Sequence, residues 1–82
     1  MEPLETFFRI NNAKFYLNLE TCSTVRNAVK NSGITSQHGT RLLRVWKDNK
    51  WVYSVKLKEG TKYKYTIEGL KIKNALQGVI YV

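Results

Sequence analysis

The stretch that decides the predicted fold is Arg41–Lys73, which reads RLLRVWKDNKWVYSVKLKEGTKYKYTIEGLKIK. From Lys50 onward, aromatic and aliphatic residues alternate with lysine and other polar residues. Successive side chains of a strand point to opposite faces of a sheet, so this period of two predicts antiparallel strands with one apolar and one basic face. We therefore expect the stretch to form the main sheet of the protein.

The turn that follows Leu57 sets the expected register of the central hairpin. A three-residue loop, Lys58-Glu59-Gly60, pairs Leu57 with Thr61 and keeps the apolar residues of both strands on one face. Its glycine suits the left-handed position at the end of such a loop. On the basic face this register sets Lys56 opposite Lys62, and like charges directly opposite one another are destabilising. A polyanionic partner would explain why the chain keeps such a pair.

The strand expected at Arg41–Lys47 can face in either of two directions. A two-residue loop after it places Trp46 in the core and buries Arg44, whereas a three-residue loop places both residues on the basic face. The second arrangement is favoured, because unpaired charges are rarely buried. On that face Trp46 could stack on an unpaired nucleic-acid base, and Phe7 and Tyr16 are further candidates for stacking.

A second hairpin is expected nearer the N-terminus. Thr6–Ile10 and Ala13–Leu19 are rich in aromatic and apolar residues, and Asn11-Asn12 between them suits a two-residue turn because asparagine tolerates positive φ. Val79–Val82 reads as a terminal strand. The fold class predicted from these segments is α+β, a single small domain with about six antiparallel strands in a curled sheet or small barrel and one short helix.

The one expected helix lies near residues 23–32. Ser23 or Thr24 can cap its N-terminus, and Gly33 is suited to end it in a left-handed conformation. A helix-turn-helix would need a second helix after the turn that begins at Gly33. None is expected, because the sequence from Arg41 onward is typical of a strand.

Length and composition limit the class of protein. The chain has 82 residues, of which 43% are hydrophobic and 12% aromatic, so residues 1–82 are expected to fold as one domain. No run of 18 apolar residues is present, and Met1–Glu5 lacks the basic start of a secretory signal. The single cysteine, Cys22, is typical of a reducing compartment. These features predict a cytoplasmic protein without a membrane span.

The sequence contains few residues that are suited to catalysis. His38 is the only histidine and is expected in an exposed polar loop, Ser36–Thr40. Together with Cys22 it cannot supply the four ligands of a structural zinc site. The six acidic residues are scattered, and the glycines form no nucleotide-binding motif. We therefore expect no enzyme activity, no catalytic residue, no cofactor and no metal.

The charge balance predicts an anionic partner. Fourteen Lys and Arg residues against six Asp and Glu give a formal net charge of +8 and a pI near 9.8. Lysine outnumbers arginine ten to four, and lysine binds phosphate as a point charge without reading bases. The predicted function is nucleic-acid binding through the phosphate backbone with little sequence specificity. The residues expected to bind are Lys50, Lys56, Lys58, Lys62, Lys64, Lys71, Lys73, Arg44 and Trp46.

The alternative is a protein-interaction module that docks on an acidic protein surface. Exposed strand edges and a basic face would serve such a role. The richness in Lys, Asn, Ile and Tyr is typical of AT-rich genomes, including those of many viruses and phages, whose small proteins often inhibit host factors. The sequence leaves the partner's identity and the oligomeric state open.

Overall fold

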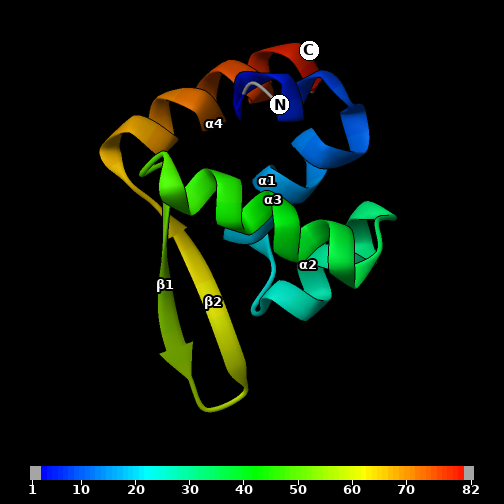
Figure 1. Ribbon diagram of the computed structural model, residues 1–82, viewed down its shortest axis with the longest axis vertical. Coiled ribbons are helices and arrows are strands. Elements are labelled where there is room, and N and C mark those ends of the chain that lie inside the picture. The colour runs from blue at the N-terminus through cyan, green and yellow to red at the C-terminus, as the bar shows by residue number, and fades with distance from the viewer. Residues whose placement is uncertain (1–2, 81–82) are drawn as a thin grey trace.

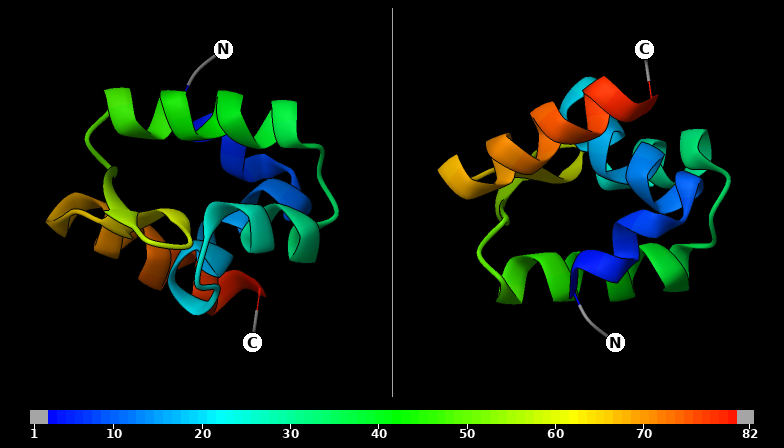
Figure 2. Two further views of the ribbon diagram at one scale, coloured as in Figure 1. Left: turned by 90° about the horizontal axis from the view of Figure 1, so that it is seen from below. Right: turned by 90° about the horizontal axis from the view of Figure 1, so that it is seen from above.

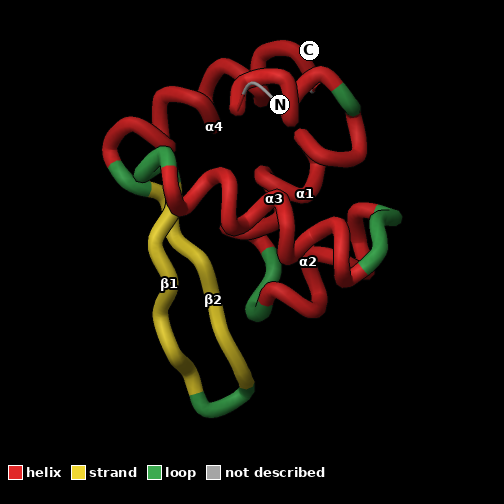
Figure 3. The backbone as a smooth tube through the Cα atoms, viewed as in Figure 1, coloured by secondary structure: helices red, strands yellow, loops and turns green. Residues whose placement is uncertain are grey.

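Most of the chain is helical. A computed structural model describes residues 3–80, and Figures 1 and 3 show that helices outnumber strands in it. The six-stranded sheet or barrel predicted from the sequence is therefore wrong: within the described residues the only sheet is one antiparallel hairpin. The elements in chain order are the 3-10 helix η1 (Pro3–Phe8), α1 (Ile10–Thr21), α2 (Val25–Ser32), α3 (Ser36–Asp48), β1 (Val52–Leu57), β2 (Gly60–Tyr65) and α4 (Ile67–Ile80).

Helix α1 is the centre of the core. Its apolar side chains point in several directions, and Ala13, Phe15, Tyr16, Leu17 and Leu19 are all buried. A helix that is apolar on most sides has to be surrounded by other elements, and α1 is contacted by η1, α2, α4 and β2. The predicted N-terminal hairpin is therefore wrong, because the two asparagines assigned to its turn lie in the first turn of α1.

Helices α2 and α3 are joined by a short turn with clear capping signals. The Thr24 hydroxyl accepts a hydrogen bond from the Asn27 amide at the start of α2, and Gly33 ends that helix with φ +72°. Thr35 then caps α3 in the same way as Thr24 caps α2. The predicted helix near residues 23–32 is confirmed. A turn of three residues, 33–35, joins the two helices, so the second helix that a helix-turn-helix requires does follow Gly33, and the expectation that none follows is wrong.

Helix α3 replaces both the polar loop and the strand that the sequence analysis placed between residues 36 and 47. Gly39, Leu42, Leu43 and Trp46 are buried along its inner face, at helical spacing. Trp46 is 0% exposed, and its Nε1 donates a hydrogen bond of 2.9 Å to Thr6 Oγ1. The expectation that Trp46 lies on a basic face is therefore wrong, and the tryptophan belongs to the core.

A glycine allows α3 to approach α2 closely. A Cβ atom on Gly39 would lie 2.8 Å from Val29 Cγ2 and 3.4 Å from Phe15 Cζ. Carbon atoms in contact normally lie about 3.5–4.0 Å apart, so only glycine fits here without a shift of its neighbours. The close approach helps to fix how α3 sits on the core.

The hairpin β1–β2 is present, but its register differs from the predicted one. Leu57 pairs with Gly60 across a two-residue turn, and Gly60 has φ +141°. Lys56 pairs with Thr61 and Lys62 with Val55, so the two lysines point to opposite faces of the hairpin. The predicted three-residue loop and the Lys56–Lys62 repulsion are both wrong.

Helix α4 occupies the region where the sequence analysis extended the sheet. Its buried and half-buried positions include Gly69, Ile72 and Leu76, at helical spacing. Val79 and Ile80, which were assigned to a terminal strand, belong to α4, and the rest of that strand lies outside the described residues. Figure 2 shows α3 and α4 on opposite sides of the molecule with the hairpin between them. Within residues 3–80, no helix has the length and apolar character needed to cross a bilayer.

Candidate nucleic-acid interface

The outer face of α3 carries a row of polar and cationic side chains. These residues are exposed, recur at every turn of the helix, and line one shallow hollow. The sequence from Ser36 to Lys47 contains no acidic residue. We call this set the α3 stripe, and it consists of Ser36, Gln37, Thr40, Arg41 and Arg44.

Within residues 3–80, the two arginines of the α3 stripe form no ion pair, although Glu5 lines a hollow with Arg41. Among residues 3–80, the only ion pairs are formed by Lys71 and Lys73, both on α4. Arg41 and Arg44 lie three residues apart on one helix face, where like charges destabilise an isolated helix by about 0.2–0.5 kcal/mol. The net positive charge of this face is suited to an anionic partner.

One hydrogen bond holds the first turn of α3 against α1. His38 Nε2 lies 2.8 Å from Oδ1 of the buried Asn12, and because an amide oxygen only accepts, Nε2 is the donor. The prediction of an exposed loop histidine is thus wrong, since His38 is half-buried in a helix. Together with Trp46 at the other end, this contact fixes the orientation in which α3 presents its outer face.

A second hollow connects the α3 stripe with the tip of the hairpin. It lies between the start of α2, the middle of α3 and the turn of the hairpin, and Thr24, Arg26 and Thr61 are among its lining residues. Thr40 lines both hollows, so the outer face of α3 continues into this groove. The helix and the hairpin tip thereby form one surface.

The predicted lysine stripe is divided between two parts of the molecule. Four of its members lie on the hairpin, namely Lys56, Lys58, Lys62 and Lys64. Lys50 is exposed at the base of the hairpin, with φ +61°. Lys71 and Lys73 lie on α4, whereas the hairpin tip points away from that helix (Figure 1). The structure therefore divides these lysines between the hairpin and α4, and Lys62 and Lys64 line a hollow with Glu20, the ion-pair partner of Lys73.

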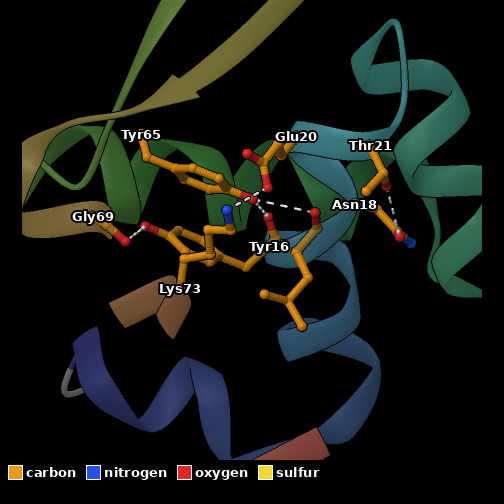
Figure 4. A network of polar contacts seen from close by, with 8 residues as sticks. Tyr16, Asn18, Glu20, Thr21, Tyr65, Gly69 and Lys73 are labelled. Atoms are coloured by element: carbon orange, nitrogen blue, oxygen red, sulfur yellow. Dashed lines mark hydrogen bonds and ion pairs between the residues drawn. The ribbon is translucent and has the colours of Figure 1, made fainter. Parts of the chain in front are cut away.

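The side chain of Lys73 is held by contacts within the protein. Its Nζ lies 2.6 Å from Glu20 Oε2 and 5.8 Å from the centre of the Tyr65 ring, and its side chain is 15% exposed (Figure 4). The Tyr65 hydroxyl donates a hydrogen bond to the main-chain oxygen of Tyr16. The Tyr16 hydroxyl in turn donates to the main-chain oxygen of Gly69. Burial raises the pKa of both tyrosines above the usual value of 10.0. This network joins α1, the hairpin and α4.

None of the three aromatic residues predicted to stack on bases lies at this surface. Trp46 and Tyr16 are 0% exposed, and Phe7 stacks on Trp46 with ring centres 5.3 Å apart. Tyr53, on the outer face of the hairpin, is 47% exposed. The sequence predicted Arg44 as a site residue, but not Gln37 or Arg41. The signal that could have found them is the helical spacing of Gly39, Leu42, Leu43 and Trp46, which places the polar residues between them on the opposite face.

The described part of the chain has few groups that could bind a metal or act as a nucleophile. Among residues 3–80, no three His, Cys, Asp or Glu side chains gather as a metal site would require. Cys22 is half-buried, and its sulfur accepts a hydrogen bond from the Asn31 side chain. Comparisons of the chain with protein-family models, with curated proteins and with solved structures found no match.

Proposed function

We propose that the protein binds double-stranded DNA, with α3 in the major groove and the hairpin against the phosphate backbone. The observation that carries this proposal is the α3 stripe, an exposed polar and cationic row on the second helix of a helix-turn-helix. In DNA-binding proteins of this arrangement, the second helix enters the major groove. The net charge of +8 favours the same class of partner.

The dimensions of α3 suit B-form DNA. Its 13 residues give a helix about 20 Å long, and an α-helix with side chains is about 10–12 Å across. The major groove of B-DNA is about 12 Å wide and admits such a helix. The deep, narrow major groove of A-form RNA does not admit side chains in this way. We therefore assign duplex DNA rather than duplex RNA as the ligand.

The hairpin supplies charge beside α3. Lys56 and Lys58 are exposed near its tip, and the tip shares a groove with α3. Lysines that neutralise phosphates release counterions, which strengthens binding at low salt without regard to sequence. The phosphate contacts that the sequence analysis assigned to a whole sheet are thus proposed for the hairpin alone.

A salt titration with two matched variants tests the proposal. A fluorescent mixed-sequence DNA duplex should bind the protein, and log affinity should fall linearly with log salt concentration. Arg44→Gln and Lys71→Gln each remove one positive charge from an exposed helical position, on α3 and on α4 respectively. Arg44→Gln should weaken binding about tenfold or more, and Lys71→Gln should leave it within about twofold.

Three results would contradict the proposal. They are absence of binding to any duplex at low salt, equal losses in the two variants, and a preference for the RNA duplex of the same sequence. Circular dichroism of each variant would show that its helices are intact. Both substitutions lie at exposed positions, so no loss of fold is expected.

A further inference from the structure

Arginine and lysine occupy different parts of the candidate interface. The cations on the first three turns of α3 are Arg41 and Arg44, whereas every cation from Lys47 to Lys64 is a lysine. The arginine guanidinium presents a planar fork of donors, and the lysine ammonium is a point charge. The fork matches the O6 and N7 acceptors of guanine in the major groove. The distribution therefore separates groups that can read bases from groups that can only contact phosphates.

We infer that α3 reads sequence, with Arg41 and Arg44 each recognising a guanine and Gln37 recognising an adenine, while the hairpin lysines add affinity without sequence preference. This inference rests on the proposed binding of duplex DNA. It replaces the expectation of a protein with little sequence specificity, which rested on the excess of lysine over arginine.

The spacing of the three side chains fits successive base pairs. Residues along a helix rise about 1.5 Å each, so Gln37 to Arg41 spans about 6 Å and Arg41 to Arg44 about 4.5 Å along the axis. Base pairs in B-DNA are about 3.4 Å apart. The three side chains thus cover about three base-pair steps, and all three lie in the part of α3 that lines one hollow.

The forks of both arginines are free to make such contacts. Neither guanidinium has a hydrogen-bond acceptor or an ion-pair partner among residues 3–80, and both residues are exposed. Glutamine offers a donor and an acceptor together, which is the pattern that pairs with the N6 and N7 atoms of adenine. The core side of α3 is held by Trp46 and His38, so these side chains project from a fixed helix.

Selection from duplexes with a random centre tests the inference. The wild-type protein at about 150 mM salt should enrich a short motif with two G·C positions. Arg41→Lys and Arg44→Lys keep the charge and remove the fork, so each should lose the preference at one position, by about tenfold to a hundredfold. Arg9→Lys, which makes the same change at an exposed position just before α1, is the matched control and should keep the whole motif.

The outcomes separate the two proposals. Retention of duplexes without any enriched motif, or a motif unchanged in both α3 variants, would overturn base reading while leaving duplex binding intact. Failure to retain any duplex would instead overturn the proposed function. Loss of the motif in Arg9→Lys to the same degree would also contradict the assignment, because it would show that the preference does not depend on α3.

Discussion

The contact between Gly39 and Val29 fixes where α3, the helix proposed to bind DNA, lies on the core. The two residues face each other where α3 crosses α2, and the missing Cβ of the glycine leaves room for the valine methyl. Glycine in a helix costs about 1 kcal/mol relative to alanine. The chain accepts this cost at a position where a methyl group would push α3, and the α3 stripe with it, away from the core.

Gly39→Ala should therefore lower the free energy of unfolding by about 1–2 kcal/mol despite its better helix propensity, because overpacking a core costs about 1–3 kcal/mol. Val29→Ala in the same molecule removes the conflicting methyl group, so the double variant should be at least as stable as Gly39→Ala alone. Urea denaturation of the four proteins of this cycle measures the coupling. A fully additive cycle would contradict the steric account.

At the scale of elements, local signals predicted some parts of the fold correctly. The caps of α2 and its left-handed glycine were readable because they depend on neighbouring residues. The hairpin was found from the alternation between Val52 and Tyr65, but its register was not. Pairing there follows the two-residue turn at Lys58-Glu59 and the contacts of β2 with the helices, whereas the prediction assumed that all aromatic residues share one face.

The wrong predictions that cover whole elements have a common cause. Buried residues are so dense in α1 that its helical period disappears, and a helix surrounded on most sides then resembles a pair of apolar strands. In α3, the order Leu42, Arg44, Trp46 imitates the alternation of a strand, although the set of buried residues follows a helical period. Because Arg44 was assigned to a strand, the sequence could name it as a site residue but could not place Gln37 and Arg41 beside it.

The proposed role of the hairpin lysines can be tested by substitution. Lys56→Gln combined with Lys58→Gln removes two exposed charges near the tip. If both contact phosphates, the slope of log affinity against log salt should become shallower by about two, equally for all duplex sequences. Lys71→Gln on α4 serves as the control and should keep the slope. An unchanged slope in the double variant would remove the hairpin from the interface.

For the whole molecule, the buried tyrosines link stability to alkaline pH. Burial raises the pKa of Tyr16 and Tyr65, and for Tyr65 nearby Tyr16 and Glu20 act in the same direction. The folded state therefore keeps its phenol protons at pH values where the unfolded chain loses them. The stability that these two groups provide is complete below pH 10, the usual tyrosine pKa, and decreases as the pH rises above it.

The free energy of unfolding should accordingly fall above pH 10, with each tyrosine contributing up to about 1.4 kcal/mol per pH unit. Tyr65→Phe should reduce the steepness of this fall, although it also removes the hydrogen bond that holds the hairpin to α1. Tyr53→Phe, which removes an exposed phenol, is the control for the change of residue type. Identical alkaline profiles for wild type and Tyr65→Phe would contradict the linkage.

The base of the hairpin is held firmly, and this determines where the chain can change length. The Trp51 amide donates to the main-chain oxygen of Trp46, and the Trp51 oxygen accepts from the Thr66 amide, so β1 begins and β2 ends at a fixed point between α3 and α4. The tip ends in a two-residue turn, and among the described residues no backbone hydrogen bond of this kind joins that turn to a helix. Adding two residues to each strand would extend the tip by about 7 Å, or two base-pair steps. Under the proposed binding of DNA, hairpin length would set how far from α3 the phosphate contacts extend, independently of which bases α3 meets.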